Sequence, residues 1–190
     1  MIIETVVTTV NKANQLNFAP MGVSFEGEYL FLRPFRDTTT YQNLITTGVG
    51  VVNITDNVLI FALSALTKAG FPHFAAQSVK CGVLIEACAY YEFSVEEVGE
   101  HGDRPLVSCR ILNVGKIRDF TGFNRGKNAV LEAVILATRV HLLPAGLILK
   151  KLKEYREIVD KTAGLAEKKA MDYIQKYVQR IVENSQPIIK

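Results

Sequence analysis

The chain has 190 residues, a formal net charge of +3, and 48% hydrophobic against 22% charged residues. This length suits one compact domain, or one domain with a modest addition, and the composition argues against a disordered chain. The basic residues are spread along the chain, with no arginine-rich arm and no ladder of basic and aromatic residues. Composition therefore favours a globular protein that does not bind nucleic acid.

Short segments rich in β-branched and aromatic residues dominate the chain up to residue 119 and predict strands. The first three are residues 5–10, 19–25 and 29–35. The turn at residues 26–28, Glu-Gly-Glu, predicts a hairpin between the second and third of them. Residues 38–47 predict a short helix that begins at a threonine cap and ends at Gly48. Residues 49–54 are almost continuously apolar, which predicts a strand covered on both faces.

The middle of the chain predicts one more short helix and two long strands. The helix is expected over residues 56–66, and the strands over 83–98 and 106–117, joined by a turn at 101–103. The order of the predicted elements begins with two paired strands, a short helix and a buried strand. It matches neither a β-sandwich repeat nor alternating β–α–β units. This order predicts a small β-barrel with helical excursions, an α+β fold that is mostly β.

The sequence pattern changes after Gly122 to apolar residues at helical spacing, with charged residues on the opposite face. Three helices are expected, over residues 127–142, 148–162 and 166–181. Breaks between them fall at residues 144–146 and at Gly164. We therefore expect a barrel domain of residues 1–120 and a C-terminal domain of three helices, residues 121–190, which packs on the barrel or on a partner chain.

The sequence indicates neither secretion nor a membrane. Residues 1–7 lack a basic start and contain Glu4, which predicts a strand rather than a signal peptide. The longest apolar segment, 130–149, is interrupted by charged residues and a proline, whereas a membrane-spanning helix needs about 18 apolar residues in a row. The 3 cysteines form no CxxC pair, which is typical of free thiols in a reducing compartment. We expect a cytoplasmic protein without a membrane partner.

The segment 33–44, between a predicted strand and a predicted helix, is the first candidate binding site. It contains Arg33, Arg36, Thr38, Thr39 and Thr40. A helix N-terminus presents unpaired backbone N–H groups and the positive end of the helix dipole. Arginine and threonine add donors suited to phosphate oxygens. The segment thus predicts a phosphate site, and the alternative is an ordinary helix cap with solvated arginines. The residues alone favour neither.

The start of the first long helix is the second candidate, because it carries Asn124, Arg125 and Lys127. Each cation in a first helical turn opposes the helix dipole by up to about 1 kcal/mol. A nearby anion, such as a substrate group, would compensate, and the alternative is two side chains directed into solvent. A nucleotide-binding P-loop is excluded. The spacing from Gly122 is one residue short, and Asn128 stands where a magnesium-binding Ser or Thr is required.

Residues 17–24 form the third candidate site. Pro20 and Gly22 flank small residues in a predicted strand, so the backbone there is accessible to a flat ligand. A kinked edge strand is the alternative explanation. No metal site is predicted, because the histidines lie far apart without ligand spacing, and no catalytic acid–base pair is recognisable.

In chain order, several of these segments resemble a known family. Residues 19–25, Ala-Pro-Met-Gly-Val-Ser-Phe, the loop 36–44 and the strand 50–53, Gly-Val-Val-Asn, resemble the first half of flavin-reductase-like split barrels. Residues 122–133 and 159–164 resemble parts of a mainly archaeal family of split-barrel proteins that bind flavin mononucleotide (FMN) and carry a C-terminal helical domain. The resemblance extends over essentially the whole chain.

The resemblance implies a homodimer with two FMN molecules at the subunit interface. The phosphate would be held by residues 36–40, together with Arg33 and Asn43, and the isoalloxazine would lie against the backbone of residues 20–23, with Asn53 nearby. The implied cofactor-binding residues are Pro20, Met21, Gly22, Val23, Arg33, Arg36, Thr38, Thr39, Thr40, Asn43 and Asn53. Arg125 and Lys127 also match family positions, from which they could reach the phosphate or an anionic substrate.

Two functions fit this resemblance. In the first, the protein is an oxidoreductase in which FMN carries the electrons and the protein binds and orients it. In the second, it is an FMN-binding electron carrier, or a dimeric scaffold without turnover. The sequence has no recognisable nicotinamide-binding fingerprint, but split-barrel reductases need none, and neither the substrate nor a catalytic residue is identified.

Overall fold

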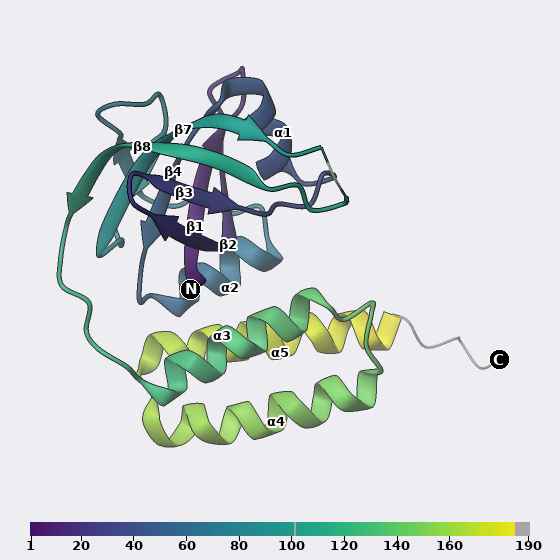
Figure 1. Ribbon diagram of the computed structural model, residues 1–190. Helices are drawn as coiled ribbons and strands as arrows, with labels where there is room; N and C mark the ends of the chain where they lie inside the picture. Colours follow the sequence, from purple (N-terminus) through teal and green to yellow (C-terminus); the bar gives the residue numbers. More distant parts are fainter. Residues whose placement is uncertain (101, 185–190) are drawn as a thin grey trace. The chain divides into compact units, whose positions relative to one another are not determined.

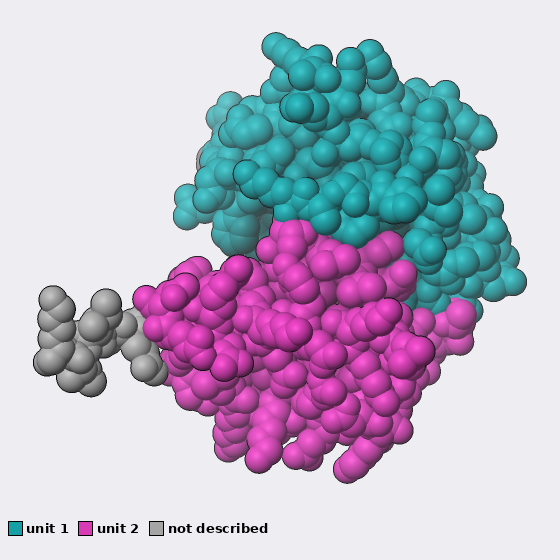
Figure 2. Space-filling view, turned by 180° about the vertical axis from the view of Figure 1, so that it is seen from behind, with its two compact units in different colours: residues 1–56, 68–120 teal, residues 57–67, 121–190 magenta. Residues whose placement is uncertain are grey.

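The computed structural model describes residues 1–100 and 102–184, and it divides into two compact units (Figure 2). Unit 1 comprises residues 1–56 and 68–120, and unit 2 comprises residues 57–67 together with the chain after residue 120. These units differ in one segment from the predicted domains of residues 1–120 and 121–190, because residues 57–67 group with the C-terminal helices. The turn expected at 101–103 includes residue 101, which lies outside the described residues.

Unit 1 contains a closed barrel of antiparallel strands in the order β1-β2-β3-β8-β7-β4 (Figure 1). The strands are β1 (Ile3–Val10), β2 (Leu16–Glu26), β3 (Tyr29–Leu32), β4 (Val49–Ile54), β7 (Ala89–Val98) and β8 (Val107–Lys116). Because β1 pairs with both β2 and β4, the sheet closes on itself. The predicted barrel in an α+β fold is confirmed.

Two apolar clusters explain why β1 and β4 are buried on both faces. Inside the barrel, Val7 and Val52 pack with Phe93. On the other face, Val51 packs with Val83 in a second cluster. That face is covered by a hairpin of β5 (His73–Ala75) and β6 (Gly82–Leu84). The continuous apolar run at residues 49–54 reflects this double burial, as predicted.

Two strand predictions were wrong in extent. The strand expected over residues 83–98 is two strands, β6 and β7, separated by a turn in which Ala87 N–H donates to the carbonyl of Leu84. The third strand ends at Leu32 and not at residue 35. The reason is Pro34, which has no N–H to donate to a ladder and restricts the residue before it.

Glu92 of β7 anchors the loop between β5 and β6. Its side chain is fully buried, and its carboxylate accepts hydrogen bonds from the backbone N–H groups of Gln77, Ser78 and Val79 at 3.0, 2.5 and 3.2 Å. The Asn113 amide donates to it at 2.9 Å. Burial alone would raise the pKa of Glu92, but these donors outweigh burial and lower it. A buried carboxylate thus holds the loop in place.

Unit 2 is a bundle of helices around one apolar core (Figure 1). Its helices are α2 (Val58–Leu66), α3 (Arg125–Thr138), α4 (Ala145–Thr162) and α5 (Leu165–Asn184). The three predicted C-terminal helices are confirmed, and α2 joins them through Val58 and Ala62. None of the helices in the described residues is both long and apolar enough to cross a membrane.

Candidate functional site

One edge of β2 is open over residues 16–22. On one side, β1 pairs with β2 from Leu16 to Val23. On the other side, β3 pairs only with residues 23–26, because it ends before Pro34. Within residues 1–100 and 102–184, no further strand pairs with this side. Alternate backbone N–H and C=O groups of residues 16–22 therefore have no strand partner on this side among the described residues and can bind a ligand.

The second part of the site is the N-terminus of α1 (Thr39–Thr47). Helix α1 contacts β1, β2, β4 and β7, and its Leu44 lies in the barrel core. Its C-terminus is capped by Gly48 with φ of 69°, as predicted. The N–H groups of Thr39 and Thr40 have no acceptor among the described residues, and the first turn has no acidic side chain. These N–H groups and the helix dipole favour an anion.

A side-chain hydrogen bond brings the two parts together. The amide of Asn17, at the start of the open edge of β2, donates to the hydroxyl oxygen of Thr40 at 3.1 Å. Thr40 is buried, and its own hydroxyl proton remains available for another acceptor. Sequence analysis placed Asn17 inside a candidate segment but did not select it. Its position just before the Ala-Pro-Met-Gly run was the signal that could have identified it.

Thr38 and Arg36 stabilise the loop before α1. The Thr38 hydroxyl accepts from Tyr41 N–H at 3.3 Å and donates to the Phe35 carbonyl at 2.7 Å, so it acts as the helix cap. The Arg36 guanidinium donates to the carbonyls of Gly102 and Glu100 at 3.0 and 2.8 Å, and to the Tyr41 hydroxyl at 2.9 Å. A phosphate contact that used the Thr38 hydroxyl as donor would require its bond to Phe35 to break, whereas Arg36 uses three of its five N–H groups in these bonds.

Arg33 and Arg104 leave positive charge next to the same loop. The Arg33 side chain is exposed, and its backbone carbonyl accepts from Nε of Arg104 at 3.1 Å. The Arg104 guanidinium lies over the Phe35 ring, 4.6 Å from the ring centre. Arg104 is distant in sequence and lies in no motif, so sequence analysis could not have found it.

The side chains of residues 20–23 have separate roles. Met21 and Val23 pack against the barrel core, and the Met21 carbonyl accepts from the Thr5 hydroxyl at 2.8 Å. A Cβ atom on Gly22 would lie 2.6 Å from Cγ2 of Ile2, so this glycine makes room for the N-terminal strand. Pro20 is half-buried in β2. Only the backbone of this segment is thus suited to a flat ligand.

Asn43 and Asn53 both have structural partners. Asn43 donates to the Thr9 hydroxyl at 3.0 Å, and Asn53 donates to the Val6 carbonyl at 2.9 Å and accepts from Leu84 N–H at 2.9 Å. Their exposed fractions are 4% and 0%. The amides hold α1 to β1 and β6 to the barrel, and an FMN contact of either residue stays a prediction.

The start of α3, in unit 2, is a closed cap. Asn124 accepts from Lys127 N–H at 3.0 Å and donates to the Thr162 carbonyl at 2.9 Å, which ties α3 to the end of α4. Nζ of Lys127 donates to the Thr121 hydroxyl at 3.2 Å, and Arg125 is exposed. An anion contact at these residues stays a prediction.

Comparison with known families identifies the chain. A model described as "Protein of unknown function (DUF447) N-terminal domain" matches residues 3–118, and a second DUF447 model matches residues 124–176. The protein belongs to the DUF447 family. The two models divide the family where the β-barrel strands end and α3 begins.

Solved structures place the DUF447 barrel among flavin-binding folds. A DUF447 protein from Methanosarcina mazei, solved with FMN bound, is 29% identical over 93% of this chain and 94% of its own, with a TM-score of 0.81. An FMN-binding protein from Thermus thermophilus is 17% identical, covers 60% of this chain and 70% of its own, and has a TM-score of 0.54. Nitrilotriacetate monooxygenase component B from Mycobacterium thermoresistibile is 14% identical, covers 62% and 70%, and has a TM-score of 0.54. The predicted resemblance to FMN-binding split barrels is confirmed.

The donors of this DUF447 protein fit a phosphate ester joined to a flat polar ring. The open N–H groups of Thr39 and Thr40 suit phosphate oxygens, and the open edge of β2 presents alternating donors and acceptors to a planar heterocycle. Among the described residues, no group of three His, Cys, Asp or Glu side chains is arranged to hold a metal ion.

Proposed function

We propose that this DUF447 protein binds FMN at the open edge of β2 and the N-terminus of α1. The observation that carries the proposal is the Asn17–Thr40 hydrogen bond, which holds the open strand edge beside open helical N–H groups. The FMN-bound Methanosarcina mazei relative supports it, since it is similar over 93% of this chain.

The phosphate binds the N–H groups of Thr39 and Thr40 and the hydroxyl of Thr40. The positive end of the α1 dipole and the charge of Arg33 add to the attraction. Arg36 and Thr38 contribute by fixing the loop through their hydrogen bonds within the chain. Donors that are already oriented bind an anion without a large loss of conformational freedom.

The isoalloxazine lies along residues 18–22 of β2, where the backbone supplies hydrogen bonds to its carbonyl and N–H groups. Bound FMN supplies hydride and single-electron transfer. The chain's own residues bind and orient it, because the open edge and the start of α1 contain neither His nor Cys among their described residues. We infer an oxidoreductase of the flavin-reductase-like class, located in the cytoplasm. A non-catalytic electron carrier is the second candidate, and reduction of the bound flavin by NADH, NADPH or a deazaflavin would distinguish the two.

We further infer a homodimer. The outward row of β8 carries Leu112 and Val114, which are 45% and 55% exposed, and Ile117 follows at 39%. An apolar row on a strand is a common feature of subunit interfaces. Dimerisation would cover this row and supply a second wall for a flat cofactor, and sedimentation of the purified protein tests it.

The cofactor assignment is tested by removing one backbone donor. Thr39→Pro deletes a single N–H group, and proline is well tolerated at the first position of a helix. Thr38 already has φ −87° and ψ 148°, which suits a residue before proline. A charge-assisted hydrogen bond is worth about 1.5–3 kcal/mol, so Thr39→Pro should weaken FMN binding by about tenfold or more.

Thr39→Ala is the matched control, because it keeps the backbone N–H. Affinity is measured by titrating FMN and following its absorbance and fluorescence. If Thr39→Pro bound FMN as tightly as Thr39→Ala, the phosphate would not lie at this helix. If the parent protein stayed colourless through gel filtration with added FMN, the proposed function would be wrong.

A further inference from the structure

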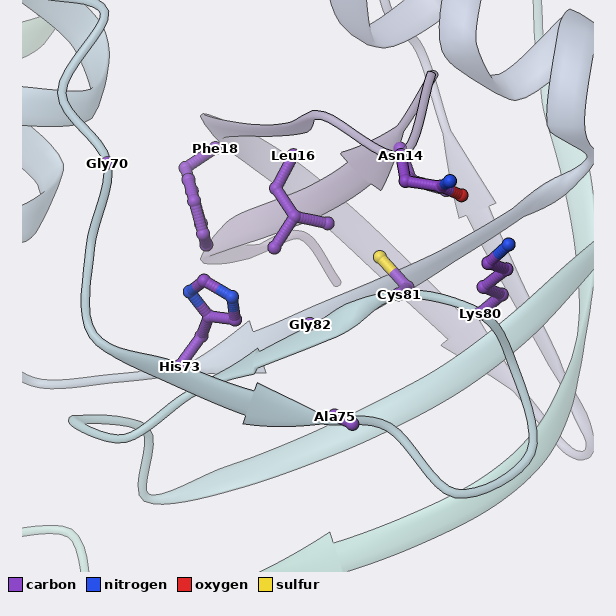
Figure 3. Close-up of a pocket in the computed structure, with 10 residues that line it drawn as sticks. Asn14, Leu16, Phe18, Gly70, His73, Ala75, Lys80, Cys81 and Gly82 are labelled. Atoms are coloured by element: carbon purple, nitrogen blue, oxygen red, sulfur yellow. The ribbon is translucent and has the colours of Figure 1, made fainter. Parts of the chain in front are cut away.

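A pocket of about 490 Å³ opens in unit 1 between the start of β2 and the β5–β6 hairpin (Figure 3). Leu16 and Phe18 line it from β2, and His73, Ala75, Lys80 and Gly82 line it from the hairpin and its loop. Small-molecule sites typically measure about 300–1,000 Å³. The pocket is therefore large enough for a single-ring compound with one substituent.

The two ends of the pocket differ in chemistry. At one end the Phe18 ring meets the Phe71 ring edge-on with centres 5.3 Å apart, and it lies 6.0 Å from the His73 ring. Figure 3 shows Phe18 and His73 together at this end, and Asn14 and Lys80 at the other. Nδ1 of His73 donates to the Phe71 carbonyl at 2.8 Å, which fixes the orientation of its ring. A flat apolar group suits the aromatic end.

The other end favours an anion. Among the described residues that line the pocket, Lys80 is the only permanently charged one, and none is Asp or Glu. Lys80 has no ion-pair partner within residues 1–100 and 102–184. The neighbouring Cys81 thiol is buried, which raises its pKa to about 12, so it adds no negative charge at neutral pH. A ligand with one anionic group would complete this end.

The pocket and the candidate FMN site use the same strand. Leu16 and Phe18 flank Asn17, and side chains alternate between the two faces of a strand. The pocket thus lies on the face of β2 opposite to the side chain that contacts α1. We propose that it binds a small planar molecule with one anionic group, such as an aromatic carboxylate. This binding does not depend on the proposed function.

The test uses the full chain without FMN and two probes of similar size, benzoate and benzyl alcohol. Binding is followed by shifts of the backbone amide signals of Lys80 and Gly82. Benzoate should bind at least tenfold more tightly than benzyl alcohol. Lys80→Gln should weaken benzoate about tenfold and leave benzyl alcohol unchanged. Lys169→Gln, an exposed lysine in α5, is the matched control and should change neither.

A second variant tests the position of the ring. Ala75 is exposed in β5, so Ala75→Leu fills the pocket without disturbing the core, and it should weaken both probes at least tenfold. The proposal is overturned if the probes bind equally, if Lys80→Gln changes nothing, or if no signals shift. It is also overturned if saturating FMN displaces benzoate, because FMN would then occupy the pocket.

The two proposals can fail separately. A protein that binds benzoate through Lys80 but does not bind FMN would refute the proposed function and retain the pocket as a site for planar anions. A protein that binds FMN but not benzoate would refute the pocket alone. Retention of benzoate by the FMN-saturated protein supports both.

Discussion

Two groups of backbone N–H donors in unit 1 differ in how they are satisfied. In the loop between β5 and β6, the amides of residues 77–79 all donate to the buried carboxylate of Glu92. At the start of α1, the amides of Thr39 and Thr40 have no acceptor among the described residues, although Thr40 is buried. The first group is completed by the chain's own anion, and the second is left for an external one.

The difference separates donors that hold the fold from donors that bind. Buried polar groups are almost always paired in native proteins, whereas the first N–H groups of a helix have no partner within the helix and can accept an external anion. The start of α3 follows the first pattern, because Asn124 uses both ends of its amide within unit 2. Two of the three segments therefore use their N–H groups to hold the fold, and the start of α1 leaves them for a ligand. A substitution in the first two should change stability, and one at the start of α1 should change FMN affinity.

The largest expected effect is the loss of the internal anion. Glu92→Ala would leave the backbone N–H groups of residues 77–79, of which Val79 is buried, and the Asn113 amide without this acceptor. Each unsatisfied buried donor costs about 1–3 kcal/mol, and we expect a loss of about 3 kcal/mol in the free energy of unfolding measured in urea. Glu96→Ala, an exposed site on the same strand, is the control and should change it by less than about 0.5 kcal/mol. Equal losses would show that the carboxylate does not hold the loop.

Acid should reproduce part of that effect. The pKa of Glu92 is lowered in the fold, so its contribution to stability is present above the unfolded pKa of about 4.3 and is lost as the pH falls through the folded value. The stability difference between the parent and Glu92→Gln should therefore be greatest at neutral pH and shrink below about pH 4. Urea midpoints measured across this range check it, and a constant difference would contradict it.

The next effect is expected in ligand affinity. Asn17→Ala removes the bond between β2 and α1, and we expect FMN binding to weaken by about tenfold, or about 1.4 kcal/mol. Thr40→Val also removes the hydroxyl proposed to bind the phosphate, so it should weaken binding at least as much. The double variant should be no weaker than Thr40→Val alone, because Asn17 acts through Thr40. Thr46→Ala, exposed on the same helix, should bind like the parent. Fully additive losses would mean that the pair does not position the site.

The smallest expected effect is a change in the free energy of unfolding without a change in FMN affinity. Asn124→Ala removes the cap of α3 and its bond to Thr162, and caps are worth about 1 kcal/mol. FMN affinity should be unchanged if this helix start is only structural. A weaker FMN titration with unchanged urea unfolding would instead assign the α3 start to the binding site.

The sequence predicted elements where one local signal decides. The β-branched runs, the threonine and glycine caps of α1 and the helical periodicity after residue 122 correspond to observed elements. Prediction from the sequence failed where the bounds or the place of an element depend on contacts with residues far away in the chain. The division between β6 and β7 depends on Cys88 N–H donating to Ile54, and the place of α2 in the helical bundle depends on contacts with α3 and α5. Periodicity over a few residues carries no information about such contacts.

What the sequence by itself determined is the fold class, the family resemblance and the segments 17–24 and 33–44 as candidate sites, because turn chemistry, caps and alternation are properties of neighbouring residues. What only the tertiary structure decided is the use of each side chain within them. The structure shows Arg36 and Asn53 bonded within the fold and Asn17 joining strand to helix, and the cofactor contacts expected of Arg36 and Asn53 stay predictions. A hydrogen-bonding side chain has few donors, and which acceptor takes them depends on chain segments far away in sequence.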